Sequence, residues 1–221
     1  MLVLISDDQI LSFINSCKTE GKSSEELLDE ELFEDFIKVP LDYFVELIDN
    51  CQLIRCTPRD IPQYSSFDSA IVTEIDYLHS HGRCRLDLIG SILPNQLTST
   101  YGAQVKYGEN HSKLLEALGL TIVEKGSVML TSLGEIFSNY THEERHQIVK
   151  KLFFRIPLVR NTLIKARFNR VSLLNELENY LSASTAKRRL GNNWYLFQLL
   201  KEGIPANSAL SERISNIDKT S

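Results

Sequence analysis

Hydrophobic residues recur along most of the chain every three or four positions, a spacing typical of helices that bury one face. In the first 64 residues this pattern predicts three helices that begin at Ser6, Ser23 and Pro40. Their apolar faces are Ile10, Phe13 and Ile14; Leu27, Leu28, Leu32, Phe33, Phe36 and Ile37; and Phe44, Leu47 and Ile48. Residues 53–56 are predicted to form a short strand. Two prolines and a lack of periodicity in residues 57–66 indicate a linker.

Residues 104–140 carry the clearest succession of elements. Their pattern predicts a helix over 106–118 that ends at Gly119, strands at 121–123 and 128–130 joined by a turn, and a helix capped by Thr131. Two further helices precede this stretch, one beginning at Phe67 and one over residues 86–93. We therefore predict one unit of three helices and a hairpin at residues 65–140. The exposed side of its third helix is expected to carry Lys106, Tyr107, Asn110, His111 and Lys113.

Beyond residue 140 the pattern is again helical, in the order helix, helix, recognition-like helix. The last long helix begins at Ser184 or Thr185 and is expected to bury Leu190, Trp194, Phe197 and Leu200. The polar residues 205–221 show no periodicity and are expected to fray. The predicted domains are thus 1–64, 65–140 and 141–204, followed by the polar tail 205–221.

The sequence around the predicted hairpin contains a recognisable motif. Residues 113–120 followed by 130–134, read as Lys-Leu-Leu-Glu-Ala-Leu-Gly-Leu and Leu-Thr-Ser-Leu-Gly, resemble the last helix and wing of winged-helix domains. The expected fold class is therefore mainly α. It consists of tandem winged-helix domains with a small β-hairpin wing, preceded by an acidic helical N-terminal domain.

Charge is unevenly distributed along the chain, although its net value is only −5. Residues 1–64 hold 14 acidic and 5 basic side chains, a net of −9, whereas residues 141–190 hold 4 acidic and 11 basic ones, a net of +7. Such asymmetry bears on partners rather than on fold. The acidic segment is either a solvated surface or a docking face for a basic partner. Its candidate partner-binding residues are Glu25, Glu26, Asp29, Glu30 and Glu34.

The basic half predicts modest affinity for double-stranded DNA that is electrostatic and largely independent of sequence. In a groove-reading helix, the triplet at 187–189 would lie in the first turns of the last long helix. The alternative is a solvated basic end of a core helix. The candidate DNA-binding residues are Lys187, Arg188, Arg189, Arg167, Arg170 and Lys165, together with Lys106 and Lys113 of the first winged helix.

The second half also resembles a family. The runs Leu130–Gly134, Glu143–Arg145, Leu152–Leu158, Asn175–Leu181 and Asn193–Phe197 look like the AAA-associated C-terminal domain behind some transporter-type ATPases, over about residues 110–200. Similar sequence motifs occur in winged-helix accessory subunits of restriction and anti-phage systems. Size and layout also resemble the subunit that accompanies an SMC-like ATPase in Lamassu-type defence. These resemblances imply a protein partner that is an ATPase or nuclease.

One motif argues for chemistry. Residues 142–146 read His-Glu-Glu-Arg-His and match H-E-x-x-H, in which two histidines one helical turn apart bind zinc and a glutamate acts as general base. A catalytic zinc needs a third ligand and a sheltered cleft, but here polar residues alternate with the histidines at the start of a helix. We expect no metal and read Glu143 and Glu144 as favouring the helix dipole.

Other signals of chemistry or targeting are missing from the sequence. Cys17, Cys51, Cys56 and Cys84 show no C-x-x-C pairing and are expected to be reduced thiols. There is no Gly-rich phosphate loop or G-x-S-x-G elbow, so we expect no enzymatic activity and no cofactor. The N-terminus is neither basic nor apolar enough for a signal peptide, and no apolar run reaches the length of a membrane span. We expect a cytoplasmic protein without membrane contact.

Two functional classes remain. In the first, the chain is a non-catalytic accessory subunit that assembles with an ATPase or nuclease in a DNA-transaction or anti-phage complex, with its basic half near DNA. In the second, it is a stand-alone DNA-binding transcriptional regulator, which would act as a symmetric homodimer. The charge division favours the first class.

Overall fold

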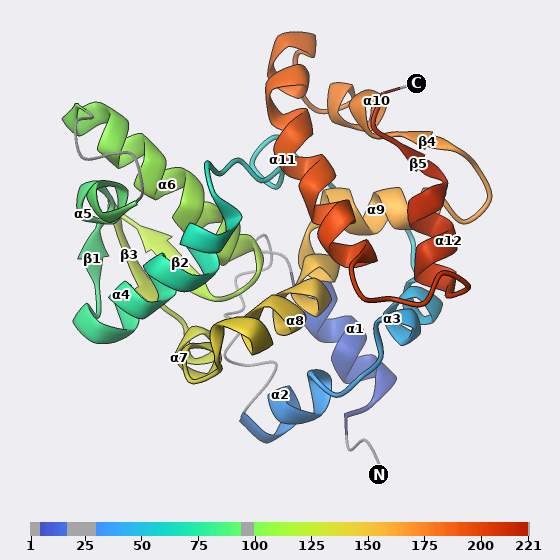
Figure 1. The fold of residues 1–221 in the computed structure, drawn as a ribbon, viewed down its shortest axis with the longest axis horizontal. Helices are drawn as coiled ribbons and strands as arrows, with labels where there is room; N and C mark the ends of the chain where they lie inside the picture. Colours follow the sequence, from blue (N-terminus) through green and yellow to red (C-terminus); the bar gives the residue numbers. More distant parts are fainter. Residues whose placement is uncertain (1–4, 17–29, 94–99, 221) are drawn as a thin grey trace. The chain divides into compact units, whose positions relative to one another are not determined.

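The computed structural model describes residues 5–16, 30–93 and 100–220, and the fold is mainly helical (Figure 1). The described residues form two compact units. Unit 1 consists of residues 5–15, 34–61 and 150–220, and unit 2 of residue 16 with 30–33, 62–93 and 100–149. The two segments that differ most in charge, 1–64 and 141–190, thus both contribute residues to unit 1.

Unit 1 is built from helices of both ends of the chain and one small parallel sheet. Its elements are α1 (Asp7–Asn15), α3 (Leu41–Ile48), η4 (Phe153–Arg155), α9 (Pro157–Lys165), α10 (Leu173–Glu178), α11 (Ala183–Lys201), α12 (Ala209–Ser215), β4 (Val171–Ser172) and β5 (Ile217–Asp218). A chain of phenylalanine rings forms the centre of its core. Phe36 lies 5.0 Å from Phe13 and 5.2 Å from Phe44, which in turn lies 5.2 Å from Phe154.

The C-terminal residues are folded, and the expectation that they fray is wrong. α12 begins after Ser208, whose hydroxyl accepts a hydrogen bond from the Ser211 amide at 3.1 Å. Leu210 and Ile214 lie one helical turn apart and are buried. After the helix, Ile217 pairs with Val171 in the parallel β4–β5 sheet. The apolar pattern was too short to recognise as a helix without its tertiary partners.

The expected buried face of α11 is wrong by one position at its centre. Asn193 is fully buried, whereas Trp194 is only partly buried. The buried residues Ala186, Leu190, Asn193, Phe197 and Leu200 follow a regular alternation of steps of four and three. The Asn193 side chain donates to the Arg189 carbonyl at 2.9 Å, so its polar group is used within the helix. An aromatic residue next to a short polar one misled the prediction.

Residues 53–56 also differ from expectation, since they form no strand. Their partner is the side chain of Asn161 on α9. The Asn161 amide donates to the Ile54 carbonyl at 2.7 Å, and its oxygen accepts from the Ile54 amide at 3.0 Å. One side-chain amide thereby satisfies the main-chain groups that a neighbouring strand would have paired.

Unit 2 contains helices and a three-stranded antiparallel sheet. Its elements are η3 (Ser69–Glu74), α4 (Ile75–His81), β1 (Cys84–Arg85), α5 (Leu86–Ile92), α6 (Tyr101–Ala117), β2 (Thr121–Glu124), β3 (Ser127–Leu130), α7 (Ser132–Ser138) and most of α8 (His142–Leu152). The strand order is β1-β3-β2, so β3 is central. The chain passes from one unit to the other after Asn15, within α2 (Glu30–Phe36), after Ile61 and within α8.

The hairpin predicted from the sequence is confirmed. β2 and β3 pair with Thr121 opposite Leu130 and Glu124 opposite Ser127. Lys125 and Gly126 at the turn have φ values of 47° and 78°, as a type I′ hairpin turn requires. Gly119 ends α6 with φ 84°, and the Thr131 hydroxyl caps α7 by accepting from the Gly134 amide at 2.9 Å. Local turn and cap chemistry was therefore sufficient to locate these elements.

Glycines allow α5 and α6 to touch along their backbones. A Cβ atom at Gly90 would lie 1.8 Å from the Gln104 carbonyl oxygen, and one at Gly108 would lie 2.0 Å from the Leu86 carbonyl oxygen. Neither site has a flexible side chain that could move away, because the obstructing atoms are backbone. This close helix crossing fixes the orientation of α6 relative to α5.

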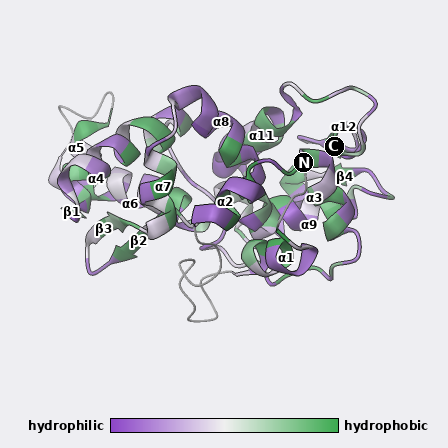
Figure 2. Ribbon diagram, turned by 90° about the horizontal axis from the view of Figure 1, so that it is seen from below, coloured by the Kyte–Doolittle hydropathy of each residue, from purple (hydrophilic) through white to green (hydrophobic). Residues whose placement is uncertain are grey.

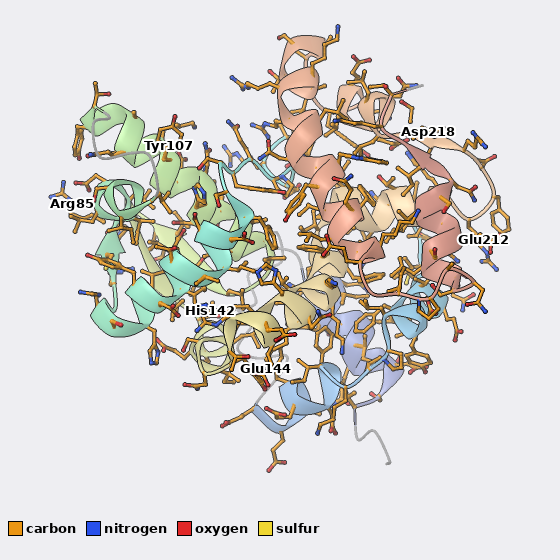
Figure 3. All side chains as sticks on the ribbon, viewed as in Figure 1. Arg85, Tyr107, His142, Glu144, Glu212 and Asp218 are labelled. Atoms are coloured by element: carbon orange, nitrogen blue, oxygen red, sulfur yellow. The ribbon has the colours of Figure 1, made fainter. Side chains whose placement is uncertain are left out.

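Two ionisable side chains are fully buried in unit 2. His111, which we expected on the exposed side of α6, is instead 0% exposed. Its Nε2 accepts from the Ser66 amide at 3.3 Å, so Nδ1 carries the hydrogen and donates to the Tyr107 carbonyl at 3.0 Å (Tyr107 is labelled in Figure 3). Burial lowers the pKa of His111. The neutral ring thus connects α6 to the segment before η3.

The second buried group is Glu74, at the end of the π-helical segment η3. Its Oε1 accepts from the Ser112 hydroxyl of α6 at 2.5 Å, and its Oε2 has no hydrogen-bond partner. Burial raises the pKa of this carboxyl to about 8, against the opposing effect of Ser112. Glu74 is therefore a protonated acid inside the core of unit 2 at neutral pH.

We predict that Gly108→Ala destabilises the protein by about 1 to 3 kcal/mol or more, because the added methyl group meets backbone atoms. Gly102→Ala on the same helix is the matched control. A Cβ atom there meets nothing within 4 Å, so the variant should keep or slightly raise stability, by up to about 1 kcal/mol. Chemical denaturation measures both. Equal effects of the two changes would contradict the backbone crossing of α5 and α6.

We also predict that Glu74 makes stability fall as pH rises. Above about pH 4.5 the unfolded chain releases this proton, whereas the folded chain keeps it until about pH 8. Between those values the folded state loses about 1.4 kcal/mol of stability per pH unit from this group. Glu74→Gln should remove that slope and be the more stable protein at pH 8.

The measurement is the free energy of unfolding of the Glu74→Gln variant and the parent protein between pH 5 and pH 8. Glu143→Gln serves as control, since Glu143 is exposed at the start of α8. This variant shows the effect of removing one exposed carboxylate. If the Glu74→Gln curve runs parallel to that of the parent protein, the Glu74 carboxyl does not titrate differently in the folded state.

Candidate functional site

The candidate DNA-binding triplet, residues 187–189, lies near the start of α11. Its three side chains differ in their exposure to solvent. Lys187 and Arg188 are exposed. Arg189 turns inward, and its Nη1 donates to the carbonyls of Pro58 and Ile61, each at 3.0 Å. Burial, with a smaller effect of Arg188, lowers the pKa of Arg189. Arg189 therefore holds the 57–61 segment of unit 1, and two cations of the triplet are left for a phosphate.

The other candidates of this half each face a carboxylate within unit 1. Lys165 Nζ lies 2.6 Å from Glu176 Oε2. Arg167 Nη1 lies 3.4 Å from Asp49 Oδ2, and Arg170 Nη1 lies 3.8 Å from Asp218 Oδ2. Asp218 is labelled on β5 in Figure 3. These pairs reduce the positive potential that an approaching polyanion would meet.

Further basic residues of the +7 segment are covered inside unit 1. Arg160 is 1% exposed and donates from Nη1 to the Ile14 carbonyl at 3.3 Å. The Arg155 guanidinium lies 4.2 Å from the centre of the Phe13 ring. Lys150 donates to the Glu202 carbonyl at 2.9 Å, and Lys151 donates to the Ile37 carbonyl. Burial lowers the pKa of Lys151 to about 8. Much of the positive charge thus serves folding.

The two candidates on α6 share one acid. Lys106 lies 3.3 Å from Glu109 Oε2, and Lys113 pairs with Glu109 Oε1. The hydrogen bond from Lys113 is the largest cause of the lowered pKa of Glu109. This face of α6 therefore carries two cations and one anion. A helix that reads a DNA groove usually offers a denser set of donors.

The acidic candidates fall into two groups. Glu25, Glu26 and Asp29 lie outside the described residues. Glu30 and Glu34 lie on α2, where Glu30 is exposed and Glu34 is half-buried. The ribbon of α2 is mostly hydrophilic in Figure 2, whereas its two phenylalanines, Phe33 and Phe36, are buried. Docking by this segment stays a prediction.

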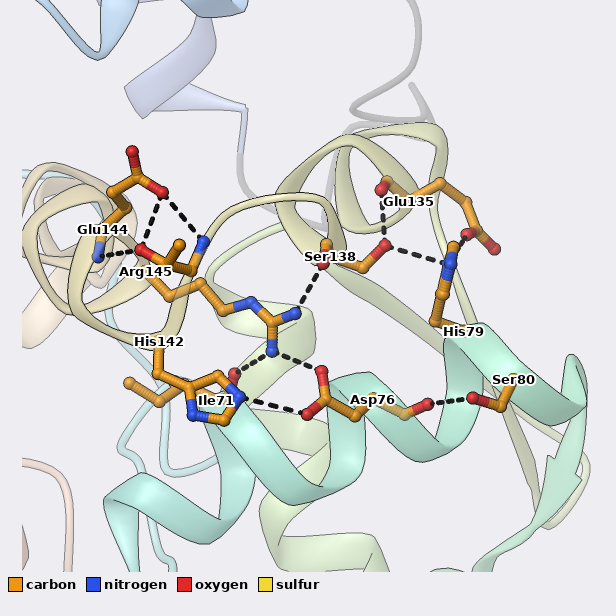
Figure 4. A network of polar contacts seen from close by, with 10 residues as sticks. Ile71, Asp76, His79, Ser80, Glu135, Ser138, His142, Glu144 and Arg145 are labelled. Carbon is orange, nitrogen blue, oxygen red and sulfur yellow. Dashed lines mark hydrogen bonds and ion pairs between the residues drawn. The ribbon is translucent and has the colours of Figure 1, made fainter.

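The H-E-x-x-H residues form the first turns of α8 (Figure 4). Glu144 closes a capping box: its carboxylate accepts from the Thr141 amide at 2.8 Å and from the Thr141 hydroxyl at 2.7 Å. These hydrogen bonds lower the pKa of Glu144. The two histidines face different acids, His142 at 3.3 Å from Asp76 and His146 at 3.4 Å from Asp68. The motif acts here as a helix start with polar links to neighbouring elements.

Arg145, inside that motif, is the central residue of the polar network in Figure 4. Its side chain is 4% exposed. Nη1 donates to Asp76 Oδ1 at 2.6 Å and to the Ile71 carbonyl at 3.4 Å, while Nη2 donates to the Ser138 carbonyl at 2.5 Å. Arg145 thus ties α8 to η3, α4 and α7. Sequence reasoning treated it as a polar spacer, because no local signal marks a buried arginine.

His79, Ser138 and Glu135 come together on α4 and α7 and superficially resemble a hydrolytic triad. Ser138 Oγ and Glu135 Oε2 both lie 2.9 Å from the same ring nitrogen, His79 Nδ1. A triad requires the serine and the acid on opposite nitrogens, so that one accepts while the other donates. The His79 and Glu135 side chains are also half exposed, at 50% and 53%. This trio lacks the geometry to activate its serine.

No group of three His, Cys, Asp or Glu side chains in residues 5–16, 30–93 and 100–220 is arranged to hold a metal ion. The absence of metal from the protein stays a prediction. In the same ranges no helix is both long and apolar enough to cross a membrane. Cys51 and Cys84 are free thiols, the Cys56 thiol donates to the Thr57 carbonyl at 3.9 Å, and Cys17 lies outside the described residues.

Exposed apolar side chains are a feature that sequence reasoning missed. Five large ones reach the surface in the described part of the chain: Tyr43, Leu53, Leu88, Tyr101 and Phe168. Phe168 is the most exposed, at 79%, and lies in the loop after α9. The run Arg167-Phe168-Asn169-Arg170, which has no helical periodicity, was the available signal.

Comparison with known proteins gives one result. Residues 109–197 match the model of the C-terminal AAA-associated domain, over less than half of the chain. The match runs from the middle of α6 to α11. No curated protein and no solved structure matched the chain. The match supports the resemblance of about residues 110–200 to the AAA-associated domain family.

Proposed function

We propose that the protein is a non-catalytic accessory subunit that assembles with an AAA-type ATPase. The observation that carries this proposal is the match of residues 109–197 to the C-terminal AAA-associated domain. The polar clusters around Arg145 and His79 support the non-catalytic part of the proposal, because their geometry is that of helix caps and contacts between helices. If the complex performs chemistry, the partner chain supplies the catalytic residues.

We further propose that unit 2 is a winged-helix module. The order of its elements up to the hairpin is helix, strand, helix, helix, strand, strand. The β2–β3 hairpin would be the wing, and β1 pairs with β3. α5 and α6 would be the helix-turn-helix pair. The partly neutralised face of α6 favours docking to protein over reading of DNA. A second winged helix at 141–204 rests on the order of helices predicted from the sequence, and membership of a restriction, anti-phage or Lamassu-type complex rests on the sequence resemblances alone.

The test is affinity purification of the tagged full-length chain from its native host, followed by mass spectrometry. We expect an AAA-type ATPase to co-purify in near-stoichiometric amount. The tag on an unrelated protein of similar charge is the control. Recovery of the chain alone, or only as a homodimer, in the presence and absence of ATP would refute the assembly role and favour the stand-alone regulator.

Contact with DNA is a second candidate function, favoured by the exposure of Lys187 and Arg188 near the start of α11. Each phosphate neutralised by a cation releases counterions, so binding should weaken steeply with salt. We predict that the Lys187→Ala, Arg188→Ala double variant lowers the slope of log K against log salt by up to about two. Arg189 is left unchanged, because its loss would release the carbonyls of Pro58 and Ile61.

Fluorescence anisotropy with a labelled DNA duplex over a salt series measures that slope. The control is a Lys106→Ala, Lys113→Ala double variant, which removes two cations from α6 and should bind as the parent protein does. If binding instead depends on Lys106 and Lys113, the DNA face belongs to unit 2. Absence of binding at every salt concentration would leave only the protein-assembly role.

A further inference from the structure

The loop between α9 and β4, residues 167–170, presents an aromatic side chain to solvent. All four residues of this loop, Arg167, Phe168, Asn169 and Arg170, are exposed, and they lie between the buried Ala166 and Val171. Burying a phenylalanine side chain contributes roughly 1.5 to 3 kcal/mol, a gain that the isolated chain forgoes at Phe168. Single exposed apolar residues are common on protein surfaces, so exposure alone does not define a site.

The loop is held firmly at both ends by one residue of the C-terminal segment. The Asn216 side chain donates to the Ala166 carbonyl at 3.0 Å. The Asn216 carbonyl accepts from the Val171 amide at 2.9 Å, next to the pairing of Val171 with Ile217. A loop fixed in this way loses little conformational entropy when a partner binds it. Phe168 is thus displayed on a supported base.

The aromatic ring itself is oriented by Arg167. The guanidinium carbon lies 4.7 Å from the centre of the Phe168 ring, within the range of a cation–π contact. Arg167 is held in turn by Asp49 at 3.4 Å, and Asp49 also pairs with the nearly buried Arg213. The Phe168 ring is thus linked through Arg167 and Asp49 to the nearly buried Arg213.

Charges around the loop indicate the kind of partner. Lys165, Arg167 and Arg170 each face an acid, which reduces the positive potential that a nucleic acid would meet at this surface. Arg170 is the least restrained of these three cations. Its side chain is 81% exposed and its contact with Asp218 is long, at 3.8 Å, so guanidinium donors remain facing solvent. Such a donor beside an aromatic residue suits an apolar pocket with a carboxylate at its rim.

We propose that Phe168 is the anchor by which this chain binds its ATPase partner, with the ring in an apolar pocket of that protein and Arg170 on a carboxylate at the pocket rim. This inference rests on the proposed function, and the loop lies within the segment 109–197 that matches the AAA-associated domain. Aromatic and arginine side chains carry much of the binding energy at protein interfaces, particularly when the free protein already holds them in place.

The experiment uses the full-length chain with the photoreactive residue p-benzoylphenylalanine at position 168, expressed in the native host and irradiated. Position 53 serves as the matched control, because Leu53 is another exposed apolar residue of unit 1, at 51%. We expect position 168 to cross-link to an AAA-type ATPase, identified by mass spectrometry, and position 53 to give much less of that product.

Affinity for the identified ATPase is then measured with Phe168→Ala, Arg170→Glu and Leu53→Ala variants. We expect Phe168→Ala to weaken binding at least about tenfold, Arg170→Glu to weaken it as well, and Leu53→Ala to leave it unchanged. Thermal unfolding of Phe168→Ala should match the parent protein, since the side chain is exposed.

The outcomes separate the inference from the proposed function. If the parent protein captures an ATPase and Phe168→Ala captures it equally well, the anchor is refuted and the assembly role stands. If the parent protein captures no ATPase, the proposed function fails and the anchor fails with it. A product at position 168 that contains nucleic acid, or only a second copy of this chain, overturns the assignment of the partner.

Discussion

Basic side chains from the second half of the chain hold the N-terminal segments in unit 1. Arg160 reaches the carbonyl of Ile14, 146 residues away in sequence, Arg189 reaches Pro58 and Ile61, and Arg213 pairs with Asp49. A buried guanidinium must find acceptors, since an uncompensated buried charge costs about 3 to 5 kcal/mol. The arrangement of unit 1, including the Asn216 support of the 167–170 loop, depends on these contacts.

That dependence explains why the charge pattern suggested partners more strongly than the structure supports. A net of −9 in residues 1–64 and +7 in residues 141–190 was attributed to two outside partners. In unit 1 an acid of the first segment, Asp49, pairs with Arg167 of the second segment and also with Arg213, which lies beyond it. Opposite charges far apart in a sequence are therefore as consistent with folding against each other as with binding other molecules.

The sequence predicted best those features whose cause is local. The hairpin turn at Lys125 and Gly126, the left-handed Gly119 and the Thr131 cap depend on residues within a few positions of one another. It predicted poorly what depends on contacts between distant segments. His111 is buried with Ser66 as a partner, Ile54 pairs with Asn161, and Ile217, which follows α12, pairs with Val171. The hydrophobic periodicity of the sequence does not reveal which of these distant residues will pair.

The candidate site shows the same difference between features that follow from local sequence and features that depend on packing. The cationic triplet of α11 was found from composition, but only packing shows that Arg189 is occupied and that Lys187 and Arg188 are not covered. Phe168 was missed because an apolar residue between two arginines has no periodicity to mark it. Its exposure is informative only together with the hydrogen bonds that fix the loop, because a mobile loop would lose on ordering much of what the ring gains on burial. A held, solvent-facing ring within the segment that matches the AAA-associated domain is therefore a stronger indication of a protein interface than either the charge pattern or the H-E-x-x-H motif.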